Sequence, residues 1–301
     1  MGIGEWAALG AAFFWTVSSL LWSKINLTAL GLNFSKNAVG STILLIHLTL
    51  FALITGQAVV RADSTAWGWL AMSALIGIVL GDTCYFRCIQ ILGARQALML
   101  ATTAPLFAAA LGWRYLQESI TLWMILGISL TVTGLITVVA GRKRAIESPG
   151  LLPGSRYLGV LFGILAAVCQ AVGAVFSKIG MEKGCDALEA TFIRLFVSLI
   201  VTLVIVLGQG RLHVIAGRVC KADVLKFLVP ATAVGTWLGI WCSQVSFKMT
   251  DVSVATTLQA TSPLFAIPIL YFFLGLRTTL SAFLGTVLAI VGVYLVVTGH
   301  G

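Results

Sequence analysis

Long apolar stretches recur along almost the whole of this 301-residue chain. A helix needs roughly 20 predominantly apolar residues to cross the hydrocarbon core of a bilayer. Ten runs that are free or nearly free of charged residues meet or approach this requirement: Trp6–Ser23, Asn37–Gln57, Trp67–Ile89, Gln96–Trp113, Trp123–Gly141, Tyr157–Ser177, Leu195–Gln209, Phe227–Phe247, Val252–Leu276 and Ser281–Gly299. The sequence therefore predicts an all-α integral membrane protein with ten transmembrane helices.

The composition agrees with this prediction. Hydrophobic residues make up 59% of the chain and charged residues only 10%, whereas soluble domains carry about 25% charged residues. The formal net charge of +9 could suit nucleic acid, but the basic residues are spread over short connections, where topology signals are expected. We therefore expect the lipid bilayer as a partner, and no nucleic acid.

Neither end-processing nor metal chemistry is indicated. The first apolar run follows Glu5 rather than a basic segment, and no clear small-residue cleavage site comes after it, so we expect a retained helix. The six cysteines form no C-x-x-C motif, and no paired histidines would complete a metal site. We interpret the cysteines as small packing residues and expect no metal and no cofactor.

The chain also contains an internal repeat at an offset of 158 residues. At this offset Pro105 matches Pro263, and three glycines spaced by seven residues match three others: Gly127, Gly134 and Gly141 with Gly285, Gly292 and Gly299. The match predicts a first five-helix repeat over residues 4–141, a linker over 142–156 and a second five-helix repeat over 157–299. Because five is odd, the two repeats should have inverted topology, as in many transporters. The seven-residue spacing places the glycines on one helical face, which permits close helix packing.

Pro105 and Pro263 are candidate helix breaks within apolar runs. Proline removes a helical hydrogen bond, so a membrane helix tolerates it only where another group satisfies the freed carbonyl. Nearby hydroxyl groups could do so: Thr102, Thr103, Thr261 and Ser262. Two interpretations stay open, a simple kink and a discontinuity that lines a cavity.

The ten runs, the duplication and the pattern TAPLF…LQESIT…G between Thr103 and Gly127 resemble EamA-type members of the drug/metabolite transporter superfamily. The stretch GDTCYFRC from Gly81 is similar to a signature found in a subset of them. The family shows a glutamate before the fifth span, here Glu118, but the second repeat has Leu276 at the matching position. The resemblance implies a basket in which spans one to four and six to nine surround a central cavity, with spans five and ten outside.

Asp82 is the leading candidate for transport chemistry, because ionisable residues inside a span usually face protein or a water-filled cavity. At the repeat offset it matches Ile240, and Arg87 matches Val245, both within the eighth run. Asp82 could be a proton or cation site, or it could form a structural ion pair with Arg87 or Arg194. The sequence favours neither alternative.

Other candidates are cations and polar or aromatic residues of the expected cavity spans. Lys178 lies at the end of the sixth run, where it could snorkel to the interface or bind an anionic substrate group. The remaining candidates could line the cavity, or they could be core or interfacial residues: Trp15, Ser19, Asn37, Tyr85, Gln170, Trp241, Gln244 and Gln259.

These observations predict a secondary transporter that exports small metabolites by alternating access, with amino acids, nucleoside-like or amphiphilic compounds as substrates. The chain has no phosphate-binding loop for ATP, so proton coupling or substrate exchange would drive transport. It also lacks the catalytic motifs H-E-x-x-H and G-x-S-x-G, and we expect no enzyme. The alternatives are a lipid flippase and a membrane enzyme acting on lipid-linked substrates. We expect a monomer or homodimer in the plasma membrane, which is the inner membrane of a bacterium.

Two signals disagree about orientation. Loops after odd-numbered spans hold 12 Lys and Arg residues, against 6 after even-numbered ones. The positive-inside rule would then place both termini outside, whereas the family resemblance implies both inside. Orientation stays open on the sequence alone.

Overall fold

The structure, a computed structural model, describes residues 1–22, 24–56, 60–92, 94–141, 156–274 and 280–299. Within these ranges all regular secondary structure is helical. The first part of the chain forms α1 (Ile3–Trp22), α2 (Ala29–Thr55), α3 (Ser64–Ser73), η1 (Ala74–Asp82), α4 (Thr83–Leu92), α5 (Ala94–Ala101), α6 (Ala104–Leu116) and α7 (Leu122–Gly141). The second part forms α8 (Arg156–Glu182), α9 (Ala187–Gly208), α10 (Leu212–Val219), α11 (Ala222–Thr232), η2 (Ala233–Gly239), α12 (Ile240–Met249), α13 (Val252–Gln259), α14 (Ser262–Leu274) and α15 (Leu280–Thr298).

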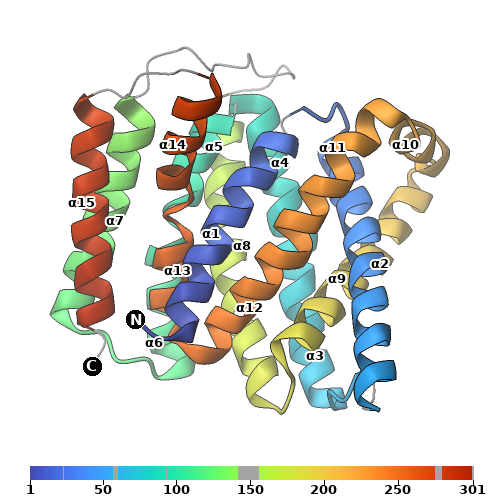
Figure 1. The fold of residues 1–301 in the computed structure, drawn as a ribbon, viewed down its shortest axis with the longest axis horizontal. Coiled ribbons are helices and arrows are strands. Elements are labelled where there is room, and N and C mark those ends of the chain that lie inside the picture. Colours follow the sequence, from blue (N-terminus) through green and yellow to red (C-terminus); the bar gives the residue numbers. More distant parts are fainter. Residues whose placement is uncertain (23, 57–59, 93, 142–155, 275–279, 300–301) are drawn as a thin grey trace.

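Most of these helices stand side by side as one bundle (Figure 1). Five continuous helical stretches are long and apolar enough to cross a membrane: Ala29–Thr55, Ser64–Leu92, Arg156–Glu182, Ala187–Gly208 and Ala222–Met249. Two shorter apolar helices cover Leu122–Thr137 and Phe283–Thr298. The residues that sequence analysis assigned to the linker, 142–155, lie outside the described ranges.

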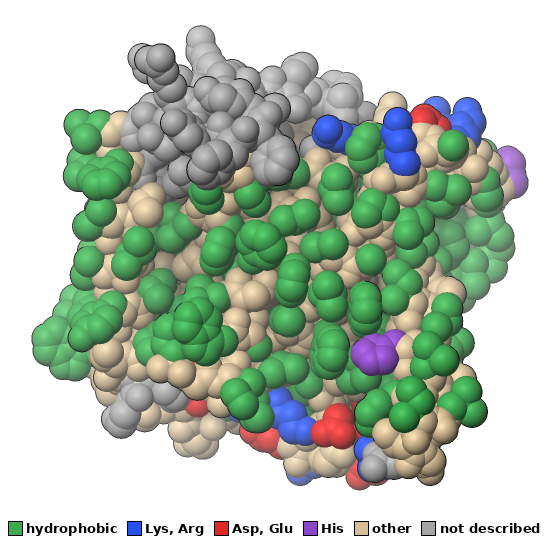
Figure 2. Space-filling view, viewed as in Figure 1, with side chains coloured by type: hydrophobic (Ala, Val, Ile, Leu, Met, Phe, Trp, Pro, Cys, Tyr) green, Lys and Arg blue, Asp and Glu red, His purple; other side chains and the backbone are tan. Residues whose placement is uncertain are grey.

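The outer surface of the bundle is apolar. Figure 2 shows hydrophobic side chains across the middle of the visible face, with charged side chains near the lower and upper right edges. Large aliphatic side chains are widely exposed, among them Leu53 at 77% and Ile54 at 83%. A water-soluble monomer rarely exposes an apolar surface this extensive, so lipid is the solvent that this surface fits.

The two parts of the chain are interrupted at matching places. The π-helical segment η1 (Ala74–Asp82) recurs as η2 (Ala233–Gly239), close to the offset of 158 residues. The break between Ala101 and Ala104 recurs between Gln259 and Ser262 at the same offset. The sequence repeat is therefore also a repeat of local backbone structure.

Hydroxyl groups satisfy backbone carbonyls at both breaks. Thr103 Oγ1 donates to the carbonyl of Leu100 at 2.6 Å. In the second part Thr261 Oγ1 donates to Leu258 O at 2.6 Å, and Ser262 Oγ donates to Gln259 O at 2.9 Å. Pro263 has no N–H to donate to the carbonyl four residues earlier, which is that of Gln259, so the Ser262 hydroxyl satisfies this freed carbonyl inside the bundle. The carbonyls of Leu100 and Leu258 accept backbone N–H groups as well, from Thr103 and Thr261.

Helices α7 and α15 pack against each other at one side of the bundle (Figure 1). A Cβ atom on Gly127 would lie 2.7 Å from the carbonyl oxygen of Gly292, and one on Gly134 would lie 2.5 Å from the nitrogen of Ala289. These pairings run in opposite directions along the two helices, which are therefore antiparallel. The glycine face predicted from the sequence forms this contact.

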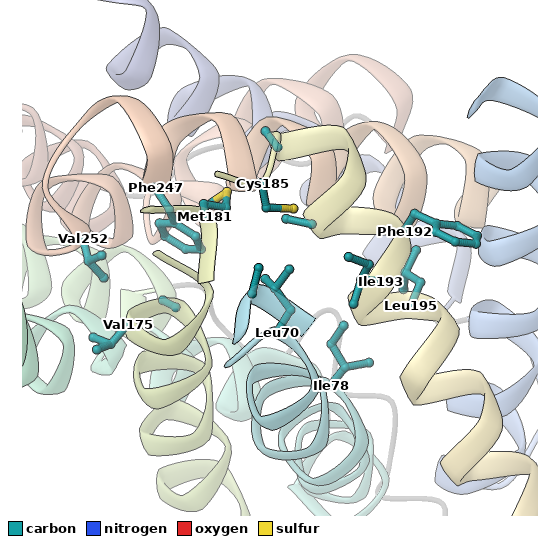
Figure 3. Packing of buried hydrophobic residues seen from close by; sticks show 14 of the residues in the cluster. Leu70, Ile78, Val175, Met181, Cys185, Phe192, Ile193, Leu195, Phe247 and Val252 are labelled. Carbon is teal, nitrogen blue, oxygen red and sulfur yellow. The ribbon is translucent and has the colours of Figure 1, made fainter. Parts of the chain in front are cut away.

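Elsewhere the bundle is held by a large apolar cluster (Figure 3). It joins Leu70 of α3, Ile78 of η1, Val175 of α8, Ile193 of α9 and Phe247 of α12, all nearly inaccessible to solvent.

Helix termini in this region are fixed by local caps. The side chain of Asp63, for example, accepts a hydrogen bond from Ala66 N at 2.7 Å and so begins α3.

Candidate functional site

A cavity of about 220 Å³ lies in the middle of the bundle. Among the residues that the structure describes, every helical element contributes to its lining except α3, α7, α10, α11 and α15. The helical breaks at Ala101–Ala104 and Gln259–Ser262 both reach it, as do η1 and η2. Thus the irregular backbone of the membrane helices is gathered around one internal space, which is where such backbone is tolerated.

An ion pair crosses one side of this cavity. Lys36 Nζ of α2 lies 2.8 Å from Asp82 Oδ2 at the end of η1, and both residues are lining residues. The Lys36 side chain is only 2% exposed, whereas that of Asp82 is 28% exposed. A buried charge is costly unless it is paired and hydrogen-bonded. Each of these two residues therefore compensates the charge of the other inside the bundle.

Asparagines hold Lys36 and the π-helical segment in place. Lys36 Nζ donates to Asn37 Oδ1 at 3.0 Å, and Asn37 Nδ2 donates to Asn33 Oδ1 at 3.1 Å. Asn33 Nδ2 in turn donates to Ile78 O at 2.9 Å, within η1. Because Asp82 is the last residue of η1, this network fixes both partners of the ion pair.

Arg194 of α9 is a second buried cation of the cavity. It is 7% exposed, and no carboxylate of the described residues lies within 4.0 Å of its guanidinium nitrogens. Its Nε has no hydrogen-bond partner. Gly77 of η1 gives the guanidinium room, because a Cβ atom there would lie 3.1 Å from Arg194 Nη2. This guanidinium is therefore a buried charge that lacks a direct counter-charge.

Aromatic side chains form another part of the lining, namely Trp15 and Trp22 of α1 with Tyr85 and Phe86 of α4. Trp22 and Phe86 meet edge to face, with ring centroids 5.8 Å apart. Trp15 Nε1 donates to Gly235 O in η2 at 3.1 Å, but Trp22 Nε1 has no partner. Together these rings offer an apolar surface with one unused donor.

The structure places most of the predicted site residues around the cavity. Those that line it are Trp15, Ser19, Asp82, Tyr85, Gln170, Arg194, Gln259 and Pro263. Asn37 does not line the cavity but supports Lys36, and Gln244 is buried behind it, where it accepts a hydrogen bond from Ser177. Trp241 packs on His47 instead. Pro105 is buried as the second residue of α6 and is not a lining residue.

The partner of Asp82 differs from the two expected from the sequence. Lys36 forms the ion pair, whereas Arg87 has an exposed side chain on the outside of α4, and Arg194 makes no direct pair with Asp82. Lys36 precedes the second apolar run by one position, so it was one of the 12 cations assigned to loops after odd-numbered spans, as Arg194 was one of the 6 after even-numbered spans. The burial of Lys36 shows that α2 begins earlier, at Ala29. The repeat offset carried the missing signal, since Lys36 and Arg194 are 158 residues apart.

Lys178 lies in a separate polar cluster near one end of the bundle. Its Nζ is 3.5 Å from Glu118 Oε1, 3.7 Å from Asp251 Oδ1, and donates to Thr250 O at 3.1 Å. Glu118 also accepts hydrogen bonds from Val252 N at 2.6 Å and Ser253 N at 3.2 Å. These are the free amides at the start of α13, where a carboxylate is stabilising. The glutamate of the first part thus caps a helix of the second; Leu276, at the matching position, lies outside the described residues.

A second charged cluster ties α9 and α12 to the segment before α3. Lys248 Nζ is 2.7 Å from Asp186 Oδ1, and Arg61 lies 3.8 Å from Asp186 and from Glu189. The hydrogen bond from Lys248 lowers the pKa of Asp186 below its ordinary value. Asp186 and Glu189 also form a capping box that begins α9. These contacts join the two parts of the chain outside the cavity.

The apolar surface, the helical bundle and the family match reported next define this chain as a multi-pass integral membrane protein, and its bundle encloses an internal cavity. The EamA-like transporter family matches it twice, over residues 2–140 and 157–298, so the chain belongs to the EamA-like transporter family. It is similar to Protein LicB of Haemophilus influenzae (strain ATCC 51907 / DSM 11121 / KW20 / Rd), with 24% identity over 225 residues, which cover 72% of this chain and 70% of LicB.

A solved crystal structure of another protein has the same fold. It superposes with a TM-score of 0.76 over 99% of this chain and 97% of the other, at 14% sequence identity. This low identity supports the architecture alone. The family membership confirms the predicted resemblance to EamA-type transporters.

Proposed function

We propose that this protein is a secondary transporter that exports a small metabolite across the plasma membrane, the inner membrane of a bacterium, and that the central cavity is its substrate site. The observation that carries this proposal is the cavity itself. Lys36, Asp82 and Arg194 line it together with four aromatic residues, which we call the aromatic wall: Trp15, Trp22, Tyr85 and Phe86. Membrane proteins keep ionisable residues at such depth mainly where they serve transport. Aromatic faces with a few polar groups suit amino acids, nucleoside-like or amphiphilic compounds.

The proposed architecture is ten membrane-spanning segments in two inverted five-helix repeats. Support comes from α7 and α15, which match each other at the repeat offset and pack antiparallel. In Figure 1, α1 and α8 also run in opposite directions. Two inverted halves around a shared site allow alternating access by rocking. The clusters around Lys178 and Lys248 would then hold one end of the bundle closed.

Asp82 is the proposed coupling residue. Its side chain is partly exposed while that of Lys36 is buried, and both residues line the cavity. Protonation of Asp82 would release Lys36 from the ion pair, which would link proton binding to a rearrangement between α2 and η1. Substrate exchange without protons is the alternative, and it requires no titration of Asp82.

The test compares metabolites inside and outside cells that express the wild type, Asp82→Asn, or no protein, at matched membrane expression. We expect one metabolite to fall inside and accumulate outside only with the wild type. Asp223→Asn is the matched control, because Asp223 is exposed and lies outside the central cavity. It should export like the wild type.

Equal export by wild type and Asp82→Asn would contradict the coupling role of Asp82. No change in any soluble metabolite would contradict export and would favour the second candidate, a lipid flippase. A lipid substrate would instead change its distribution between the two leaflets, which a leaflet-specific label measures.

A further inference from the structure

The two cations of the cavity occupy equivalent positions of the repeat. Lys36 and Arg194 are 158 residues apart, and the helices that carry them, α2 and α9, begin at Ala29 and Ala187, the same distance apart. Both side chains line the cavity and both are at least nine-tenths buried. The repeat therefore supplies one cation from each half to the same space.

The counter-charge, in contrast, is supplied only once. Asp82 pairs with Lys36 in the first half, and the position that matches Asp82 in the second half is Ile240. This isoleucine also lines the cavity. Arg194 thus lacks the carboxylate that its counterpart has.

The charges of the lining residues therefore do not balance. Lys36, Asp82 and Arg194 leave one formal positive charge in the cavity. An isolated buried ion is strongly unfavourable unless a partner of opposite charge compensates it. The missing partner should carry a single negative charge, because a dianion would leave one charge of its own uncompensated.

Several residues that line the same space carry buried hydrogen-bonding groups without a partner. Arg194 Nε, Trp22 Nε1 and Thr236 Oγ1 have no partner, and all three residues line the cavity. The arginine and tryptophan groups can only donate, and the threonine hydroxyl can also donate. A guanidinium in a cavity whose lining also carries other donors is suited to an oxyanion, since arginine binds carboxylates through two parallel hydrogen bonds.

We propose that the transported solute is an organic monocarboxylate with an apolar body, and that Arg194 binds its carboxylate. This inference rests on the proposed function. The apolar body would lie against Trp15, Trp22 and Phe86 of the aromatic wall. Lys36 stays paired with Asp82, so the bound solute neutralises the cavity. Arg194 is then the residue that selects the charge of the solute.

Binding to the purified protein in detergent tests this inference without any transport step. The probes are indole-3-acetate, indole-3-acetamide and tryptamine, which share one ring and carry a negative, no or a positive charge. We expect indole-3-acetate to raise the melting temperature of the wild type and to bind roughly tenfold or more tightly than the amide, the range expected for hydrogen bonds to a charged group. Tryptamine should bind more weakly than either.

Three variants locate the effect. Arg194→Gln should lose the preference for indole-3-acetate while keeping its affinity for the amide, and Arg194→Lys should keep part of the preference. Lys24→Gln is the matched control, because Lys24 is an exposed cation above the ring of Phe227, outside the cavity. It should behave like the wild type.

Equal binding of the three probes by the wild type would overturn the inference, even if Arg194→Gln failed to fold. A retained anion preference in a folded Arg194→Gln would overturn it too. Neither result would contradict the proposed function, because the protein could still export another solute. Conversely, anion binding without export in cells would contradict the proposed function and not the assignment of the site.

Discussion

Lys36 is a charged side chain inside an apolar helix, and neighbouring polar groups stabilise its buried charge. Asp82 supplies the opposite charge and Asn37 a further acceptor, at 2.8 and 3.0 Å. Removing one partner of a buried pair leaves the other charge uncompensated, which costs more than removing both.

A double-mutant cycle with Lys36→Met and Asp82→Asn follows from this pair. We expect Lys36→Met to lower the free energy of unfolding by on the order of 3 kcal/mol, and the double variant to lose clearly less than the sum of the singles. Unfolding in mixed micelles measures this. Lys24→Met is the control and should change little. Losses that add to within about 0.5 kcal/mol would mean that the two residues are not coupled.

At this scale the sequence identified Asp82 and Arg194 but not the partner of Asp82. Charge and depth can be read from an apolar run, whereas the direction of a side chain depends on helix rotation. Lys36 was not predicted as this partner because it lies next to the boundary of an apolar run, where a lysine is commonly interfacial. Its burial follows from packing of α2 against η2 and α9, which no local pattern encodes.

At the scale of elements, the breaks near Pro105 and Pro263 could be predicted, because proline removes a backbone donor. The π-helical segments could not. Their sequences, ALIGIVLGD and AVGTWLG, contain no proline, and side chains from other helices hold their carbonyls. Asn33 does so for η1 and Trp15 for η2.

The glycine contact between α7 and α15 gives a prediction of its own. Gly134→Leu should force the two backbones apart and lower stability by about 1–3 kcal/mol, the usual cost of overpacking. The melting temperature of the purified protein measures this. Gly68→Leu is the control, since a Cβ atom at Gly68 meets nothing within 4 Å.

An unchanged melting temperature for Gly134→Leu, at normal expression, would contradict the close packing of α7 on α15. Because neither helix lines the cavity within the described residues, the folded fraction of this variant should still bind a cavity ligand with normal affinity.

At the scale of the whole molecule, hydropathy and the repeat predicted the membrane bundle and its division into two similar parts. They could not predict the cavity, because it depends on which side chains from twelve helical elements face inward together. Nor do they settle the orientation. Burial of Lys36 and Arg194 removes one cation from each side of the loop count, so the excess after odd-numbered spans is unchanged.

The central claim is that the cavity is the solute pathway of a carrier, and counterflow by purified protein in liposomes tests it most directly. The labelled solute is the metabolite identified by the export comparison. Wild-type protein and two variants are compared: Ala167→Trp, which fills the cavity from a buried lining position, and Leu53→Trp, which adds the same bulk on the exposed outer surface.

We predict saturable counterflow for the wild type and for Leu53→Trp, and its loss in a folded Ala167→Trp. Flux that does not saturate, or that Ala167→Trp leaves unchanged, would contradict the account.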